Sequence, residues 1–211
     1  MTNNSENRLR LDLASASKKP VLYLDWDGVV NFFGSRNQYR KRSGFHYLRR
    51  GSAMPIAEFS PWGGNGFAPR GPFSLNWSAE LLRKLAELPV DIVALTTWRH
   101  SFTELIKATQ WELESFRVLD WVDGPKGKEH AGKIPALIQD QIMNPRPFIW
   151  ADDEAIAFYN DDHRKMLEGI PQLLLAPDEK VGLTMADYEA MLKFLASLGL
   201  NTDLDSDSEH E

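Results

Sequence analysis

Five short and almost uninterrupted apolar runs recur along the chain, and they constrain the fold more than any other feature of the sequence. They cover residues 21–25, 91–96, 116–122, 147–152 and 171–176. Short apolar runs of this kind predict β-strands, and hydrophobicity that is near-continuous rather than alternating is typical of strands buried on both faces. The runs therefore predict a parallel sheet with helices covering both of its faces.

Helical patterns separate these runs. The segments with apolar residues at helical spacing are 76–88, 101–113, 134–142, 153–169 and 183–199. Ser101 and Glu104 predict a capping box at the start of the second segment. Thr184 is the expected N-cap of the last segment, and Gly199 is its expected C′ residue. Strands that alternate with helices predict right-handed βαβ units, and hence a Rossmann-like three-layer α/β/α sandwich around a central parallel sheet.

Residues 31–75 interrupt this alternation between the first strand and the first helix. Gly, Pro, Ser, Arg and aromatic residues dominate there, and helical periodicity is weak. The segment sets a single acidic residue, Glu58, against seven cationic ones: Arg36, Arg40, Lys41, Arg42, Arg49, Arg50 and Arg70. We expect an insertion of loops or a small β-flap with a basic surface.

The remaining sequence predicts one domain over residues 19–200. The stretch 1–18 and the acidic tail 201–211 are polar and patternless, which predicts disorder in both. The chain has no cysteine, so neither a disulfide nor a thiolate can serve its structure or chemistry. No segment has the apolar character of a secretory signal or a membrane span, so we expect a cytoplasmic protein without a membrane partner. The sequence gives no indication of an oligomeric state.

Polar residues follow three of the predicted strands at their carboxyl ends. They are Asp25 and Asp27 after the first strand, Thr96 and Thr97 after the second, and Asp152 and Asp153 after the fourth. Ligands of open α/β sheets bind beyond the carboxyl ends of the strands, so these side chains are expected to share a cleft. Two acidic clusters repel there unless a cation neutralises them, and oxygen ligands favour a hard ion such as Mg²⁺. This set predicts phosphoryl transfer, in which one carboxylate attacks phosphorus and a second moves a proton.

The motifs "YLDWDGVV", "ALTTW" and "IWADDE", with Lys133 before the last of them, resemble in order the four motifs of the haloacid dehalogenase (HAD) superfamily of phosphohydrolases. More narrowly, "LYLDWDGVVN", "VALTTWRH", "GKIPAL", "PFIWADDE" and "GLTMADYEAML" resemble the HAD domain found in composite RNA-repair proteins and their stand-alone bacterial relatives. The resemblance spans residues 19–198, and the basic insertion matches least. A lone DxDG is a modest signal, but four motifs in order at strand ends are specific.

The resemblance implies Asp25 as the nucleophile, which forms an aspartyl-phosphate and binds Mg²⁺. Asp27 would act as general acid and then as general base, with its backbone carbonyl on the metal. Gly28 is a predicted substrate-binding residue, and as a glycine it would permit the sharp turn by which the chain leaves the strand. Asp152 and Asp153 would complete the metal site. Related phosphatases favour Asp153 as the direct ligand, but the residues alone leave that choice open.

The same resemblance assigns the phosphate contacts. Thr96 would hydrogen-bond the transferring phosphate with help from the Thr97 backbone, and Lys133 would offset negative charge on the aspartate and the phosphate. Lys126 or Lys128 could serve in place of Lys133, although the "GKIPAL" match favours Lys133.

Three residues within or next to these motifs can each be interpreted in two ways. Arg99 stands where relatives often carry an acidic residue, so it is a candidate substrate contact or an ordinary residue of a solvated helix start. Trp26 and Trp98 are interpreted as packing in the core or the cleft wall rather than as stacking platforms. The motif residues could also be plain caps and strand formers, but the four motifs together favour the catalytic interpretation.

The sequence thus predicts a Mg²⁺-dependent phosphohydrolase that cleaves a phosphomonoester, with RNA ends, DNA ends or nucleotides as candidate substrates. The basic insertion is the reason for this choice, because cations interleaved with aromatic residues suit a polynucleotide, and Arg40, Lys41 and Arg42 are its candidate phosphate contacts. A solvated basic flap is the competing interpretation of that segment. The alternative functions are a small-molecule phosphatase and a non-catalytic module that binds phosphate or nucleic acid.

Overall fold

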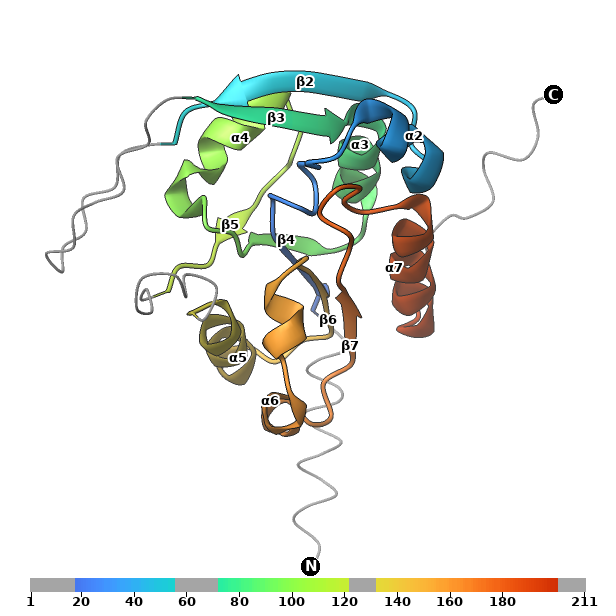
Figure 1. Cartoon of the computed structure of the whole chain (residues 1–211). Helices are drawn as coiled ribbons and strands as arrows, with labels where there is room; N and C mark the ends of the chain where they lie inside the picture. Colours follow the sequence, from blue (N-terminus) through green and yellow to red (C-terminus); the bar gives the residue numbers. More distant parts are fainter. Residues whose placement is uncertain (1–17, 56–71, 122–131, 201–211) are drawn as a thin grey trace, which may run out of the picture.

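The central sheet of the computed structural model contains five parallel strands in the order β5-β4-β1-β6-β7 (Figure 1). Their bounds are β1 Val21–Leu24, β4 Asp91–Ala94, β5 Arg117–Val118, β6 Phe148–Ala151 and β7 Gln172–Leu175. All five predicted runs contribute a strand, so the predicted α/β fold with a central parallel sheet is confirmed. At the edge of the sheet, β5 pairs only with β4 and covers two residues of the predicted 116–122.

The structure describes residues 18–55, 72–121 and 132–200. The acidic tail predicted over 201–211 and the predicted N-terminal arm, except for Lys18, lie outside these ranges. Among the described helices, none combines the length and the apolar character that a bilayer-crossing helix needs.

Helices cover both faces of the sheet and enclose two hydrophobic cores. They are α3 (Ala79–Glu87), α4 (Phe102–Thr109), α5 (Lys133–Met143) and α7 (Met185–Ser197), while α6 (Asp161–Met166) has no buried residue of its own. Leu22 and Leu24 of β1 belong to the core beneath α3, α4 and α7. Val21 and Tyr23 belong to the opposite core, which includes residues of α5 and Leu167 at the end of α6. Because successive residues of a strand point to opposite faces, each fully buried run supplies both cores of the predicted three-layer sandwich.

The last helix begins and ends as predicted, whereas α4 does not. The Thr184 hydroxyl accepts a hydrogen bond from the Asp187 N–H at 3.2 Å, the Asp187 carboxylate accepts one from the Thr184 N–H at 2.8 Å, and Gly199 follows the helix with φ +78°. The capping box expected at Ser101 is wrong. A 3₁₀ turn, η1 (Arg99–Ser101), runs directly into α4, so Ser101 has helical dihedral angles and its side chain makes no capping bond.

The single helix predicted over 153–169 is also wrong, because two short elements replace it. They are the 3₁₀ turn η3 (Ala155–Phe158) and α6. Between them Tyr159 is extended, and the Asn160 side chain accepts hydrogen bonds from the backbone N–H groups of Asp162 and His163, each at 3.1 Å. A new N-cap in the middle of the apolar pattern therefore restarts the helix.

The basic insertion contains a β-hairpin, as predicted, and a helix that was not predicted. The hairpin pairs β2 (Leu48–Ala53) with β3 (Phe73–Ser78) in antiparallel register, and it lies across the top of the view in Figure 1, over α3 and α4. β3 ends beyond residue 75, where the first helix was expected, and Ser78 then caps α3 by accepting from the Leu81 N–H at 3.2 Å. We call residues 31–78 the flap.

The unpredicted helix is α2 (Arg36–Ser43). Ser35 caps its start by accepting from the Gln38 N–H at 3.2 Å, and Gly44 ends it in the left-handed conformation. Tyr39, its main anchor, is buried and stacks on Phe32 with ring centroids 4.0 Å apart. The sequence did not predict this helix, because α2 has no apolar stripe and Tyr39 is its only buried aromatic residue.

The loop between β7 and α7 is hydrogen-bonded to the first residues of the flap, which we call its root. The N–H groups of Phe33 and Gly34 donate to the carbonyls of Glu179 and Lys180 at 2.9 and 3.1 Å, and the Leu183 N–H donates to the Val29 carbonyl at 2.8 Å. Gly34 permits this approach, since a Cβ there would lie 2.2 Å from the Lys180 oxygen. The segment that leaves β1 is therefore bound along its length to the C-terminal part of the fold.

Candidate active site

The strand order places β1 where the chain changes direction across the sheet. From β1 the chain continues to β4 and β5 on one side and later to β6 and β7 on the other, and ligands of such sheets bind at the carboxyl ends beside this switch point. Leu24 pairs with Ala151, and the Asp25 N–H donates to the Ala151 carbonyl at 3.0 Å. This register brings the ends of β1 and β6, with Asp25 and Asp152, to one level.

Lys133, the first residue of α5, joins these two carboxylates. Its Nζ lies 2.5 Å from Asp25 Oδ2 and 2.7 Å from Asp152 Oδ2, and the side chains of Lys133 and Asp152 are 0% exposed. Burial alone would lower the pKa of Lys133, but the charges of Asp25 and Asp152 outweigh it and raise this pKa above its ordinary value. Lys133 is thus a protonated bridge between the first and fourth motifs.

The other oxygen of Asp152 is also occupied. Asp152 Oδ1 accepts hydrogen bonds from the backbone N–H groups of Glu154 and Ala155, at 3.0 and 2.6 Å. Asp153 differs, because it is half-buried and its carboxylate lies against Gly28, where a Cβ would come within 2.1 Å of Oδ2. The missing side chain of Gly28 admits Asp153, and its positive φ of +74° is a conformation that glycine adopts without strain.

Asp25, Asp152 and Asp153 form a group that could hold a metal ion, with one oxygen of each carboxylate within 4.8 Å of the others. Burial and the neighbouring carboxylates raise the pKa of Asp153 to about 7, and burial raises the pKa of Asp25 to about 6 despite Lys133. Three carboxylates against one ammonium leave two negative charges in excess when all are ionised. This oxygen-only donor set fits a hard divalent cation such as Mg²⁺.

Asp27 lies two residues after Asp25 and is held by two side chains. Its Oδ1 accepts a hydrogen bond from the Asn31 amide at 2.6 Å, and its Oδ2 accepts one from the Trp98 indole N–H at 2.8 Å. Its carboxylate is not part of the group that could hold a metal in the described ranges. The proposed metal contact through the Asp27 backbone carbonyl stays a prediction.

Thr96 and Thr97 follow β4, next to the end of β1. The Leu95 N–H donates to the Leu24 carbonyl at 2.9 Å, which fixes the two strand ends together. Thr96 is fully buried and its hydroxyl accepts from the Trp98 N–H at 3.4 Å, whereas Thr97 is exposed. The two threonines therefore stand at the same edge of the sheet as the carboxylates.

A family model described as the HAD domain in Swiss Army Knife RNA repair proteins matches residues 21–188. The chain belongs to this family. The resemblance predicted from the four motifs is confirmed. Searches among curated proteins and among solved structures found no match.

In this HAD domain Arg99 turns away from solvent towards the end of β5. It has a positive φ of 46°, its guanidinium lies 4.6 Å from the centre of the Trp121 ring, and its NH1 is 3.3 Å from Asp120 Oδ1. Its side chain is 15% exposed. Its role as a substrate contact stays a prediction. Lys126 and Lys128, the alternatives to Lys133, lie outside the described residues.

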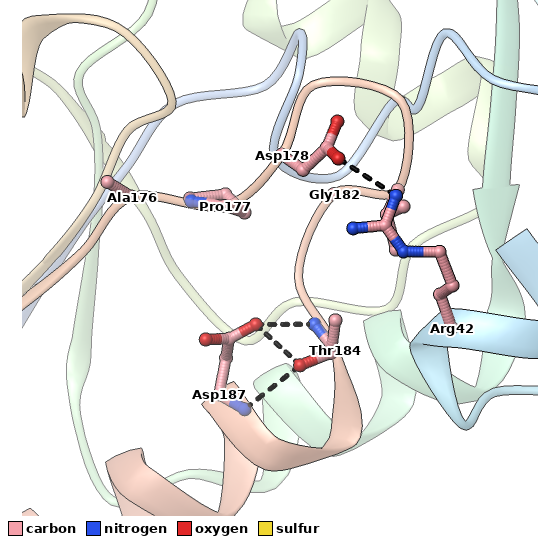
Figure 2. A pocket seen from close by; sticks show the side chains of 8 residues that line it. Arg42, Ala176, Pro177, Asp178, Gly182, Thr184 and Asp187 are labelled. Carbon is pink, nitrogen blue, oxygen red and sulfur yellow. Dashed lines mark hydrogen bonds and ion pairs between the residues drawn. The ribbon is translucent and has the colours of Figure 1, made fainter.

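The three flap cations of the prediction differ in their surroundings. Arg40 and Lys41 are exposed on α2, and the described residues offer neither of them an ion pair. Arg42 points towards the loop after β7 and pairs with Asp178 at 2.9 Å (Figure 2). The Lys180 backbone N–H and Arg42 lower the pKa of Asp178. Arg42 and this loop line a small pocket with Ala176, Pro177, Asp178, Val181, Gly182, Thr184 and Asp187.

Two residues that contact Asp27 were missed by the sequence analysis. Trp98 was interpreted as packing only, and Asn31 was assigned no role, yet both donate to the Asp27 carboxylate. An Asn four residues after an Asp in a loop is a weak signal for such a bond. The direction in which an indole N–H points cannot be predicted from the sequence.

Proposed function

We propose that this HAD domain is a Mg²⁺-dependent phosphohydrolase that cleaves phosphomonoesters through an aspartyl-phosphate on Asp25. The observation that carries the proposal is the Lys133 bridge between Asp25 and Asp152, together with Asp27 at the exit of the same strand. A buried lysine offsets part of the charge of a carboxylate cluster, so that one of its carboxylates can serve as nucleophile beside a bound cation.

The proposed reaction has two steps. In the first step Asp25 Oδ forms a bond to phosphorus as the bond from phosphorus to the leaving oxygen breaks, and Asp27 gives its proton to that oxygen. In the second step Asp27, now a carboxylate, takes a proton from water as the water oxygen bonds to phosphorus and the bond from phosphorus to Asp25 Oδ breaks, which restores the Asp25 carboxylate. The products are an alcohol and inorganic phosphate.

Asp25 and Asp153 would hold Mg²⁺, because the fully buried Asp152 already accepts three hydrogen bonds from the protein, whereas Asp25 accepts two and Asp153 is half-buried. Bound Mg²⁺ would supply positive charge that offsets the phosphate and the excess carboxylate charge. Asp152 would then act by fixing Lys133 and the start of η3. Lys133, the Thr96 hydroxyl and the Thr97 backbone N–H would bind the phosphate oxygens.

We propose nucleic-acid ends as the substrate class, with nucleotides as the smaller members of that class. The family description refers to RNA repair, and the flap adds exposed cations on α2 and β2: Arg36, Arg40, Lys41, Arg49 and Arg50. Their charge suits a phosphate backbone beyond the reacting group.

A Mg²⁺-dependent phosphatase screen tests this function. It compares oligonucleotides that carry a 3′- or 5′-phosphate with nucleotides and sugar phosphates, and Asp25→Asn serves as the inactive control. We expect release of phosphate by the wild type, none by D25N, and preference for an oligonucleotide. Preference for a sugar phosphate would support the small-molecule alternative, and a wild type without any activity would support the non-catalytic one.

The contribution of the flap is tested by neutralising Arg40 and Lys41 with Gln, while Arg42 stays in place for its ion pair. We expect the KM for an oligonucleotide to rise severalfold at low salt and the salt dependence to weaken, because each phosphate contact contributes to that slope. The KM for p-nitrophenyl phosphate, which lacks a backbone, should not change. Equal effects on both substrates would contradict a polynucleotide contact at α2.

A further inference from the structure

Asp27 is constrained more tightly than a carboxylate at a loop needs to be. Each of its two oxygens accepts one hydrogen bond from a buried side chain, Asn31 or Trp98, which are 2% and 7% exposed. Hydrogen bonds from two different side chains, one to each oxygen, restrict the rotation of the carboxyl group about its side-chain bonds.

Both partners are held in turn by one strand of the flap. The backbone N–H of Asn76 in β3 donates to Asn31 Oδ1 at 2.8 Å, and the Phe32 N–H donates to the Asn76 carbonyl at 3.1 Å. The ring of Phe73, also in β3, packs edge-on against Trp98 with centroids 5.6 Å apart. β3 therefore supports each of the two donors through a separate contact.

We propose that Trp98 and Asn31 are positioning residues for Asp27, and that flap strand β3 holds both of them in place. The inference rests on the proposed function, since it concerns the proton that Asp27 gives and takes. Transfer of this proton requires the donor oxygen within hydrogen-bond reach of the leaving oxygen, so a freely rotating carboxylate would transfer it slowly. The flap would thus orient a catalytic residue in addition to lying beside the site.

This role makes a prediction that a purely structural role does not. An alkyl phosphate has a strongly basic leaving oxygen and needs the proton from Asp27, whereas p-nitrophenolate leaves without one. Loss of positioning should therefore slow attack on an alkyl phosphate far more than attack on p-nitrophenyl phosphate. General damage to the site would slow both alike.

Trp98→Phe is the direct test, because it keeps an aromatic ring at this position and removes the indole N–H, together with part of the ring volume. The rate of the first step is measured in single-turnover experiments with the Mg²⁺-loaded enzyme and each substrate. We expect a loss of about tenfold or more with the alkyl phosphate, the size of one hydrogen bond to a charged group, and less than about threefold with p-nitrophenyl phosphate.

Trp111→Phe is the matched control. The Trp111 indole N–H also donates a buried hydrogen bond, to the Leu82 carbonyl at 2.7 Å, and Trp111 lies in the same hydrophobic core without a bond to Asp27. This variant should lose stability and change both rates by the same factor. An unchanged W98F rate on the alkyl phosphate, or an equal loss on both substrates, would overturn the positioning role. Inactivity of the wild type on both substrates would instead overturn the proposed function, and the inference with it.

The part played by β3 is tested with Phe73→Ala, a change at a side chain that is 42% exposed and so tolerated by the fold. We expect a loss of about threefold that is again confined to the alkyl phosphate, and little further loss when F73A is added to W98F, because the two residues act through one bond. Fully additive losses would overturn the support of Trp98 by the flap.

Discussion

Replacing Lys133 with Met tests the charge balance of the site directly. Met keeps much of the length of the Lys side chain but has no ammonium, so Asp25 and Asp152 stay buried without their cation. Both contacts of the ammonium are short, 2.5 and 2.7 Å, and Lys133 and Asp152 are 0% exposed. Removing one partner of a buried ion pair costs about 3–5 kcal/mol, and since two carboxylates share this ammonium we expect a loss of about 4 kcal/mol at about pH 8.

The loss of stability should depend on pH, because Asp25 and Asp152, once they have no ammonium partner, can take up protons. Burial already raises the pKa of Asp25 to about 6 in the wild type, and the absence of Lys133 would raise it further. Between about pH 4 and this folded-state pKa the folded variant binds more protons than the unfolded chain, so its stability rises as the pH falls. The wild type gains in the same way only below its own Asp25 pKa of about 6, so the cost of the substitution decreases as the pH falls from about 8 towards about 6. We expect the cost of K133M at about pH 5 to be about half of that at about pH 8.

Urea unfolding without metal, followed by tryptophan fluorescence, measures both effects. With a slope of about 2 kcal/mol per molar urea, the midpoint should fall by about 2 M at the higher pH. Lys107→Met is the matched control, because Lys107 makes an exposed ion pair with Glu104 at 2.7 Å, and its loss should cost less than about 0.5 kcal/mol. A K133M cost within about 1 kcal/mol of the control, or one that is the same at both pH values, would refute the reasoning.

Three further predictions concern the metal group and the C-terminal helix. Because burial raises the pKa of Asp153 to about 7, protons compete with Mg²⁺ for this carboxylate. Added Mg²⁺ should therefore raise the melting temperature more at about pH 8 than at about pH 5. The reverse order would contradict a metal site at Asp153. Gly28→Ala should abolish that Mg²⁺ effect, because its Cβ would collide with Asp153, whereas Gly169→Ala, with φ +86° and open space around it, should cost about 1–2 kcal/mol of stability and keep the effect. Thr184→Ala should lower the free energy of unfolding by about 1 kcal/mol through loss of its cap, and an unchanged urea midpoint would argue against the capping box.

The sheet could be predicted because strands buried on both faces leave their mark in composition alone. β1 and β6 are buried at every position, so no register or partner had to be known to recognise them. The flap gave no comparable signal. In α2, Arg36–Ser43, only Tyr39 and Ser43 are buried, and its true markers were the flanking residues Ser35 and Gly44. A helix anchored by one aromatic contact has no periodicity to detect.

The candidate site divides in the same way. Asp25, Asp152 and Asp153 could be predicted to meet because the carboxyl ends of parallel strands share an edge, and their mutual approach is what the structure has. The contacts of Asp27 depend on how the loop after β1 folds back and on which way one indole points, and neither is encoded in strand order. The catalytic and substrate-binding roles of all these residues stay predictions.

The hydrogen bonds between the loop after β7 and the root of the flap bear on how this domain can be divided or joined to others. The four motifs end with Glu154, yet the chain that follows Asp27 is hydrogen-bonded to Glu179, Lys180 and Leu183. These three residues lie within the family match, which ends at residue 188. That loop is itself fixed by the start of α7, which continues to Ser197. A fusion that ends after the last motif would remove the residues that hydrogen-bond to the segment after Asp27, so a junction should be placed after residue 200.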